Sequence, residues 1–340
     1  MARNAGCHVA PPRTTACTMS AIGSVRLMPV IACAHAAHIP SCAARRMMRG
    51  VSLPAILIGL VLALAATVMA SRLLLTARAA YAAVAEDTLI GEKGQQALEV
   101  ITTQLRQSGW SPQGWPPGEP ALAALANCGQ ATPGPLPTCT SAALTPGAAS
   151  ASSGSDLLQV RFAGSSAPTD AGLADETVVD CAGQGVPETR TPASGAPAGL
   201  SLFYIGRADD GEPQLLCRYP SRQTGRMMDG HWTSRSLIRG VEHLRFRFGV
   251  DDNGDGTPDR ILSATDIGAN TATWQRVISA QVALVVRAER RSASGPSPAL
   301  TLFRDPDIRY TPQDAPQRLR KVFTAAVQLR NPPPCGAATC

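Results

Sequence analysis

The longest apolar run of the chain predicts a helix that crosses a membrane once. Residues 51–70 read VSLPAILIGLVLALAATVMA and contain no charged side chain, while Arg45, Arg46 and Arg49 precede them and Arg72 follows. At about 1.5 Å per residue, a helix of this length spans about 30 Å, the thickness of a hydrocarbon core. The excess of arginine before the run indicates that this side stays cytoplasmic.

The helical pattern continues beyond the apolar run. Apolar side chains recur mostly at steps of three and four residues from Tyr81 to Leu105, which gives a partial stripe along one side of a helix. We therefore expect one helix over residues 51–107. Gly91 and Gly94 each lower helix stability by up to about 1 kcal/mol relative to alanine, so a bend or local melting is expected there.

The rest of the chain predicts a long loop and then strands. Alternating apolar residues indicate a strand at 244–250, with polar residues such as His243 and Arg245 on its other face. Asp209 to Gly211 is a turn signal between two further strands. Because each strand has one apolar face, an antiparallel sheet covered on one side by the amphipathic part of the helix is expected. The predicted strands lie at 157–162, 200–204, 215–219, 244–250, 278–286 and 323–329.

The resulting fold class is α+β, with a long N-terminal helix on an antiparallel sheet and long loops rich in proline and glycine. The predicted division is a basic leader at 1–50, a membrane helix at 51–75, an amphipathic helix at 76–109, a Pro/Gly/Ala-rich loop at 110–155 and a β-rich globular domain at 156–340.

The charge distribution argues against a nucleic-acid partner. The net charge is +6, but the first 50 residues contain six arginines and no acidic residue, which leaves 25 basic and 25 acidic residues in the body. A neutral body gives no electrostatic support for phosphate binding. Arg287, Arg290 and Arg291 form a small cluster that Glu289 interrupts, and we interpret it as a solvated loop.

The cysteines of the body indicate an oxidising compartment. Their number is even and no Cys-x-x-Cys pair is present, which suits disulfides better than zinc. Six cysteines allow fifteen pairings, and the sequential one is favoured because Cys335 and Cys340 close a short loop. A reduced chain in the cytosol is the alternative. The candidate disulfide residues are Cys128, Cys139, Cys181, Cys217, Cys335 and Cys340.

The start of the apolar run resembles the type IV prepilin signal. The basic leader ends in Gly50, and Val51, Ser52 and Leu53 follow. In that family a prepilin peptidase cuts after the glycine and methylates the new N-terminus, so the resemblance implies a cut between Gly50 and Val51. A start at Met47 or Met48 would make residues 1–46 a mis-assigned leader. A plain signal anchor that is not cleaved is the alternative.

One position departs from the family pattern. The family usually carries glutamate at the fifth mature residue, where this chain has Ala55. That glutamate complements the free amine of a neighbouring subunit in the filament. Its absence implies a minor subunit or a position at the filament tip.

The body resembles the PilW family of type IV pilus minor pilins over nearly all of residues 51–332. The stretches that carry this resemblance are ALEVITTQLRQSGW, GVEHLRFRFGVDDNGDGTPD, WQRVISAQVALVVRAE and RLRKVFTAAVQLRNP. The resemblance implies a pilin-like fold and a non-enzymatic role in initiating pilus assembly at or near the tip, in motility or cell adhesion. It also places five helix residues first in the membrane and later in the filament core: Leu53, Ala55, Leu57, Leu60 and Leu64.

The resemblance further implies a location and partners. The chain would span the inner membrane once, with its N-terminus cytoplasmic and its body periplasmic, and would then enter the pilus. Its partners would be other minor pilins, the major pilin, the inner-membrane assembly platform, the prepilin peptidase and a tip adhesin, and no cofactor would be required. A tip pseudopilin of a type II secretion system is the near alternative.

One acidic loop is a candidate calcium site. Residues 251–259 match D-x-N-x-D-G, the first half of a calcium loop in which oxygen ligands occupy alternate positions. The twelfth position, where a bidentate glutamate is expected, is Leu262. A polar turn of Asx and glycine residues is the alternative. The candidate ligands are Asp251, Asn253, Asp255, Thr257 and Asp259.

An enzyme is the hypothesis from another class. After the leader the histidines are His231 and His243, and neither lies in H-E-x-x-H. No G-x-S-x-G elbow, P-loop or dinucleotide fingerprint is present. We therefore interpret both as ordinary solvated or half-buried histidines, and a signal-anchored periplasmic enzyme is the distant alternative.

Overall fold

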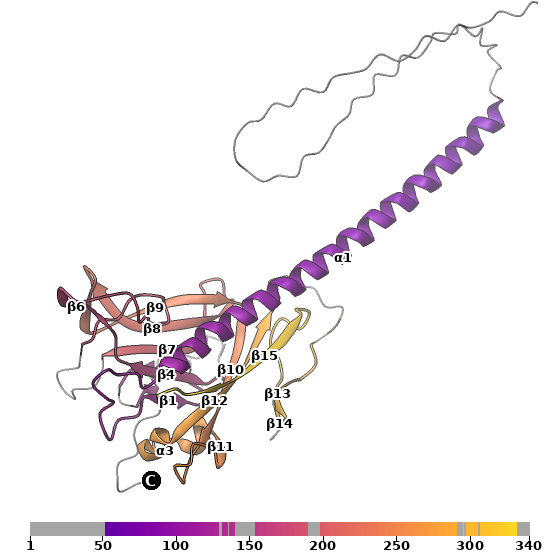
Figure 1. The fold of residues 1–340 in the computed structure, drawn as a ribbon. Coiled ribbons are helices and arrows are strands. Elements are labelled where there is room, and N and C mark those ends of the chain that lie inside the picture. The colour runs from indigo at the N-terminus through magenta and orange to yellow at the C-terminus, as the bar shows by residue number, and fades with distance from the viewer. Residues whose placement is uncertain are drawn as a thin grey trace, which may run out of the picture. The chain divides into compact units, whose positions relative to one another are not determined.

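A single long helix opens the part of the chain that the structure describes. The computed structural model describes residues 52–128, 131–134, 136–139, 154–189, 198–290, 295, 297–304 and 307–331. The helix, α1, is Leu53–Gln107 (Figure 1). The predicted helix is therefore confirmed from Leu53 onward, and its predicted first residue, Val51, lies outside the described residues. Pro54 fits in the first turn because an N–H group there needs no partner within the helix.

Burial divides α1 into two parts along its length. An 18-residue window of the helix has a mean hydropathy of 2.5, and none of it is buried within the chain. Among the described residues, α1 is the one helix whose length and composition allow it to cross a membrane. Its buried side chains begin at Ile90 and end at Leu105. The amphipathic stripe therefore contacts the body only over the last five turns.

Of the bend or local melting expected at Gly91 and Gly94, the melting is wrong, because α1 continues through both residues. Gly94 is buried, and a Cβ atom built on it would lie 2.4 Å from the ring of Phe323. A Cβ built on Gly91 would meet nothing within 4 Å. Gly94 thus lets the helix approach a strand closely, and the packing outweighs the low helix propensity of glycine.

The first sheet has five antiparallel strands in the order β1-β4-β7-β8-β9. The hairpin expected around Asp209 to Gly211 is confirmed, since it joins β7 to β8. The strands are β1 (Leu122–Leu125), β4 (Leu157–Phe162), β7 (Gly199–Arg207), β8 (Pro213–Gln223) and β9 (Arg226–Arg239).

The second sheet has four antiparallel strands in the order β11-β10-β12-β15. Three of them match the segments predicted from alternating hydrophobicity, at 244–250, 278–286 and 323–329. The strands are β10 (Val241–Val250), β11 (Arg260–Ser263), β12 (Val277–Arg287) and β15 (Arg320–Gln328).

Short elements complete the body. Three small hairpins are formed by β2 (Ala131–Thr132) with β3 (Thr138–Cys139), β5 (Ser166–Ala167) with β6 (Asp170–Ala174), and β13 (Leu300–Arg304) with β14 (Asp307–Tyr310). Two short helices lie between β11 and β12: α2 (Ala264–Ile267) and α3 (Thr271–Gln275).

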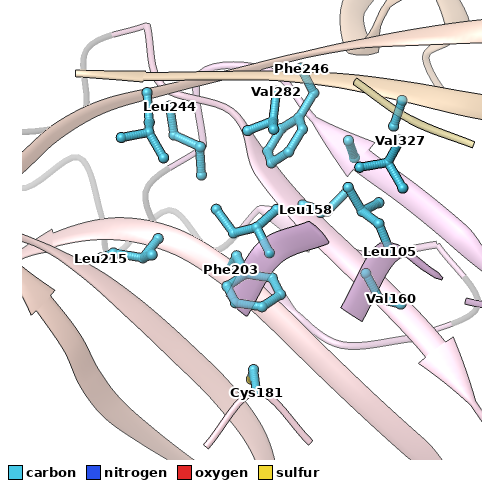
Figure 2. Close-up of a cluster of buried hydrophobic side chains, with 14 of the residues drawn as sticks. Leu105, Leu158, Val160, Cys181, Phe203, Leu215, Leu244, Phe246, Val282 and Val327 are labelled. Carbon is cyan, nitrogen blue, oxygen red and sulfur yellow. The ribbon is translucent and has the colours of Figure 1, made fainter. Parts of the chain in front are cut away.

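One hydrophobic core joins α1 to both sheets. Figure 2 shows Leu105 of α1 beside Leu158 and Phe203 of the first sheet and Phe246 and Val282 of the second. These side chains are at most 1% exposed. Because apolar surface removed from water is the dominant favourable term in folding, the second half of α1 and the two sheets stabilise one another.

The expectation of a sheet covered on one side only is wrong for the second sheet. The β13–β14 hairpin covers its other face, where Leu302 and Phe303 bury Ala283 and Val285 of β12. His243 of β10, expected on an exposed polar face, is 5% exposed. The hairpin that covers His243 lies some sixty positions later in the chain, so the pattern of the β10 strand alone does not reveal this burial.

The expectation of a continuous loop at 110–155 is also wrong in part. Residues 122–125 form β1, which pairs with β4 at the edge of the first sheet. Ala123 and Ala124 are 1% and 2% exposed, so this short alanine and leucine segment contributes to the core. Its small side chains and proline-rich surroundings mask the strand pattern.

The two helical glycines give a matched prediction about the packing of α1. Gly94→Ala should lower the free energy of unfolding by about 1 to 3 kcal/mol, since the new methyl group must displace the Phe323 ring. Gly91→Ala should raise it by about 0.5 to 1 kcal/mol, because its surroundings are open and alanine favours the helix. Urea unfolding of the full chain in detergent measures both, and equal effects would contradict the proposed close contact.

Candidate functional site

The exposed apolar side chains of α1 form a surface that we call the apolar helix surface. The predicted residues Leu53, Leu57, Leu60 and Leu64 all belong to it and are 57% to 73% exposed. A surface of this size in water marks a site of contact with lipid or with another protein. Its large residues are Leu53, Ile56, Leu57, Ile58, Leu60, Val61, Leu62, Leu64, Val68, Met69, Leu73, Leu74 and Leu75.

The hydroxyl groups along this surface are satisfied within the helix. The Thr67 hydroxyl donates to the Leu64 carbonyl at 2.8 Å, and the Ser71 hydroxyl donates to the Thr67 carbonyl at 2.7 Å. A hydroxyl that bonds its own backbone needs no water, so it is tolerated in hydrocarbon. The surface is therefore chemically suited to lipid or to a packed bundle of helices.

Ion pairs flank the region where α1 contacts the body. Lys93 of α1 pairs with Glu289 at 2.5 Å, and Asp87 of α1 pairs with Lys321 of β15 at 2.6 Å. Exposed pairs of this kind contribute at most about 1 kcal/mol each, so the apolar contacts supply most of the stability here.

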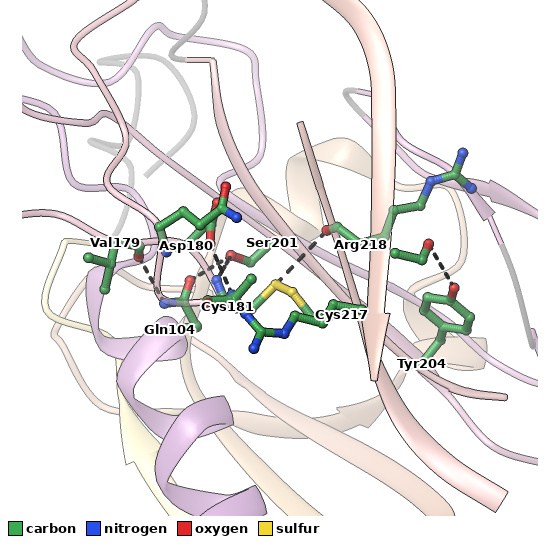
Figure 3. The surroundings of a disulfide bond; sticks show 12 residues. Gln104, Val179, Asp180, Cys181, Ser201, Tyr204, Cys217 and Arg218 are labelled. Atoms are coloured by element: carbon green, nitrogen blue, oxygen red, sulfur yellow. Dashed lines mark hydrogen bonds between the residues drawn. A yellow bond between two sulfur atoms is a disulfide. The ribbon is translucent and has the colours of Figure 1, made fainter. Parts of the chain in front are cut away.

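The last turns of α1 are held next to a disulfide (Figure 3). The Gln104 amide donates to the Val179 carbonyl at 3.1 Å and accepts from the Ser201 hydroxyl at 2.7 Å. The N–H of Cys181 donates to the same hydroxyl at 2.9 Å. Cys181 is bonded to Cys217 of β8. A crosslink that closes a loop of this length stabilises the fold by on the order of 3 kcal/mol.

Two of the three sequential disulfides are present in the described residues. Cys128 is bonded to Cys139, and Cys181 is bonded to Cys217. Cys335 and Cys340 lie outside the described residues, as do Gly50 and Val51 of the predicted processing site.

A buried ionic network lies beside the second sheet and corrects the interpretation of Arg287. That side chain is 4% exposed and makes a bidentate pair with Glu212, at 2.9 and 3.0 Å. Arg318 binds the same carboxylate at 2.7 Å. Although burial raises the pKa of Glu212, the hydrogen bonds from Arg287 and Arg318 hold it below its usual value. Arg287 therefore stabilises the fold. Of the two arginines of the predicted cluster that the structure describes, Arg290 is the exposed one.

His243 also belongs to the buried part of the second sheet. Its ring stacks on Tyr310 of β14 with centroids 4.4 Å apart, and its Nδ1 lies 3.2 Å from the Ser155 hydroxyl. Burial, together with the nearby charge of Arg245, lowers the pKa of His243 to about 3. A histidine held neutral in this way has a structural part in the fold, and the expected solvated or half-buried setting is wrong for it, because the residue is buried.

The candidate calcium residues lie together in one loop after β10. Both oxygens of Asp251 accept backbone N–H groups, from Gly254 at 2.6 Å and from Gly256 at 2.8 Å. The Asn253 amide donates to Asp255 and Asp259. Among the described residues, no three His, Cys, Asp or Glu side chains form a group that could hold a metal. The calcium site stays a prediction, and ligation would require the Asn253 amide to turn its oxygen inward.

The elements agree with the fold class expected from the sequence, since a long helix with an exposed apolar half packs by its other half on antiparallel sheets. The model of the PilW family, described as Type IV Pilus-assembly protein W, matches residues 202–331. The resemblance to PilW is thereby confirmed over the strands from β7 to β15. These residues include the second sheet, the calcium-loop candidate and both ends of the ionic network.

The comparisons with solved structures and with curated proteins show a weaker likeness or none. A solved structure described as a type IV-like pilin, TTHA1219 from Thermus thermophilus, shares 13% sequence identity with the chain and has a TM-score of 0.34. The match covers 72% of this chain and 97% of that one. No curated protein matches the sequence.

Calcium titration tests the loop prediction. We expect weak binding of calcium at millimolar concentration by the full chain in detergent, with heat detected by calorimetry. Asp255→Ala should abolish that heat, whereas Asp209→Ala, in the exposed turn before β8, should leave it unchanged. Absence of heat in the unmodified chain would leave the loop as a turn held by its own hydrogen bonds.

The burial of His243 predicts a pH dependence of stability. Its folded pKa lies below the unfolded value of 6.5, so the unfolded state gains a proton first as the pH falls. Stability should therefore decrease below pH 6.5 by about 1.4 kcal/mol per pH unit down to about pH 3. In His243→Gln this contribution disappears, and between pH 7 and pH 5 the variant should lose about 2 kcal/mol less than the parent in urea unfolding. Equal losses would contradict a buried neutral histidine.

Proposed function

We propose that the chain is a minor pilin of a type IV pilus that acts in the initiation of assembly, at or near the tip. The observation that carries this proposal is the apolar helix surface, on the same helix whose second half is buried in a body with a PilW match. In a pilus-assembly protein one such helix occupies two surroundings in turn: it lies first in the membrane and later among other helices.

The sequence of the apolar half supports packing against other helices. Small residues recur at every fourth position from Ala55 through Gly59 and Ala63 to Thr67 and Ser71. Side chains four residues apart form a ridge along a helix, and such ridges pack into the grooves of a neighbouring helix. Small residues in the ridge allow the two backbones to approach closely in lipid. A Cβ on Gly59 would meet nothing within 4 Å of the chain, so no contact inside the protein explains this glycine.

The proposed route begins in the inner membrane. The prepilin peptidase cuts between Gly50 and Val51, and the chain, with its body in the periplasm, joins other minor pilins, the major pilin, the assembly platform and a tip adhesin. Ala55 lacks the carboxylate with which a subunit inside the filament meets the amine of its neighbour, which supports a place at the tip. The same feature would suit a tip pseudopilin of a type II secretion system.

Deletion and complementation test this function. The deletion strain should lose most surface pili in a shearing assay, and the unmodified chain should restore them. Leu60→Arg should not restore them, because arginine at the centre of a membrane helix costs about 2.5 to 3.5 kcal/mol. Ala82→Arg is the matched control, since Ala82 is exposed on α1 beyond the apolar run, and it should restore pili.

Two outcomes would contradict the proposal. Normal pili in the deletion strain would exclude a role in assembly, and lost secretion with intact pili would favour the secretion pseudopilus. Mass spectrometry of the mature chain tests processing independently. N-methylated Val51 is expected, and an intact leader would favour a signal-anchored protein.

A further inference from the structure

β15 forms the outer edge of the second sheet, and among the described residues no strand pairs with its outer side. The Leu329 N–H donates to the Ile278 carbonyl, in register with the pairs Phe323 with Leu284 and Ala325 with Val282. Hydrogen-bonded pairs alternate along an antiparallel ladder. The odd-numbered residues of β15 therefore bond β12, and the even-numbered ones direct their N–H and C=O groups outward. Those residues are Val322, Thr324, Ala326 and Gln328.

Beyond Lys321, this edge lacks the features that usually protect an edge strand. Residues 322–327 read VFTAAV, with no charge and no proline, and four of the six are apolar and partly or fully exposed. The β9 edge of the first sheet differs, since β9 carries Arg226, Arg235 and Arg239 and its pairing with β8 has two register shifts. Long uncharged edges associate with other strands, and proteins blunt those that must stay free.

Grooves lie on both faces of the same edge. One groove of about 560 Å³ is lined by Leu302 and Phe303 of β13 together with Val322 and Thr324. The other, of about 600 Å³, lies between β15 and α1, and polar side chains of α1, among them Gln95, Glu99 and Arg106, line it together with Leu98 and Phe323. Side chains of a strand point alternately to opposite faces. A strand added at this edge would therefore place one row of side chains in each groove.

We propose that β15 is the docking edge for an extended, uncharged segment of another subunit of the same assembly, which adds a strand to the second sheet. Main-chain hydrogen bonds to Thr324 and its even-numbered neighbours would supply affinity, and small or aliphatic side chains in the groove beside Leu302 and Phe303 would supply specificity. This inference rests on the proposed function, because it takes the partner from the pilus.

A second copy of this chain does not fit the edge. An isologous pair of β15 edges is antiparallel, with a two-fold axis normal to the sheet. α1 packs on one face of that sheet, with Gly94 against Phe323, so this axis would reverse the direction of α1 in the second copy. Two chains paired in that way cannot share one membrane or one bundle of parallel helices. An isologous pair is therefore excluded, and the proposed occupant is a segment of a different subunit.

Photo-crosslinking in the producing bacterium tests the proposal. The full chain carries p-benzoylphenylalanine in place of Gln328, which is exposed at the end of β15, and mass spectrometry identifies the crosslinked peptide. The expected adduct joins an uncharged extended segment of another pilus protein. Thr324→Pro removes an outward N–H without breaking a bond to β12, and should lower the yield by about tenfold or more.

Two further variants make the test decisive. Ala326→Lys keeps every N–H group and adds a charge at the exposed edge, so it should lower the yield as well even if the proline variant folds poorly. Thr324→Val is the matched control, since it keeps the N–H and favours the strand, and its yield should equal that of the parent. Equal yields in all variants, or adducts only with this chain or with lipid, would overturn the proposal.

The same strains separate this proposal from the proposed function. If the deletion abolishes pili while Thr324→Pro and Ala326→Lys assemble them with unchanged crosslinks, the edge proposal alone fails. If the deletion leaves pili intact, the proposed function fails whatever the crosslinks show.

Discussion

The structure depends on one constraint, which is that a single continuous helix has to suit two surroundings. Over residues 53–70 α1 carries no charged side chain on any side, and over its last five turns it is apolar mainly where it contacts the two sheets. Burial begins at Ile90, where the stripe first reaches the core. Gly94 allows the helix to lie directly on Phe323, so the contact is close enough to hold the helix by dispersion and apolar burial.

That contact requires a body that does not move beneath the helix, and polar groups provide much of this rigidity. Asp156, just before β4, accepts from the Phe246 N–H at 2.9 Å and from Arg245 at 2.8 Å, which joins the first sheet to the second. Glu212 joins the start of β8 to the end of β12 through Arg287. Buried charges of this kind are tolerated only when every partner is present, so they favour one arrangement of the sheets.

The sequence could predict those parts of the fold that follow from local patterns. α1 follows from twenty uncharged residues and a stripe at helical spacing, and the long strands follow from alternation. The burial of His243 and Arg287 could not be predicted, because the β13–β14 hairpin and residues 314–320 that cover them lie far along the chain. The close packing of Gly94 was missed for the same reason, since its partner Phe323 lies more than two hundred residues away. A buried charge inside a strand pattern, as at Arg287, is the one signal that could have suggested a salt-bridge partner.

The edge strands β9 and β15 differ in charge, and this difference bears on the proposed assembly. A monomer that had to remain soluble would be expected to blunt both edges, as β9 does with three arginines. β15 instead presents uncharged residues beside the strand face on which α1 rests, so a strand added there would extend the same sheet that supports the helix. Binding at the edge and seating of α1 would then stabilise one another, because both order β15. Under the two proposals, such a subunit would be most stable when its partners are bound, because binding to the folded chain stabilises it.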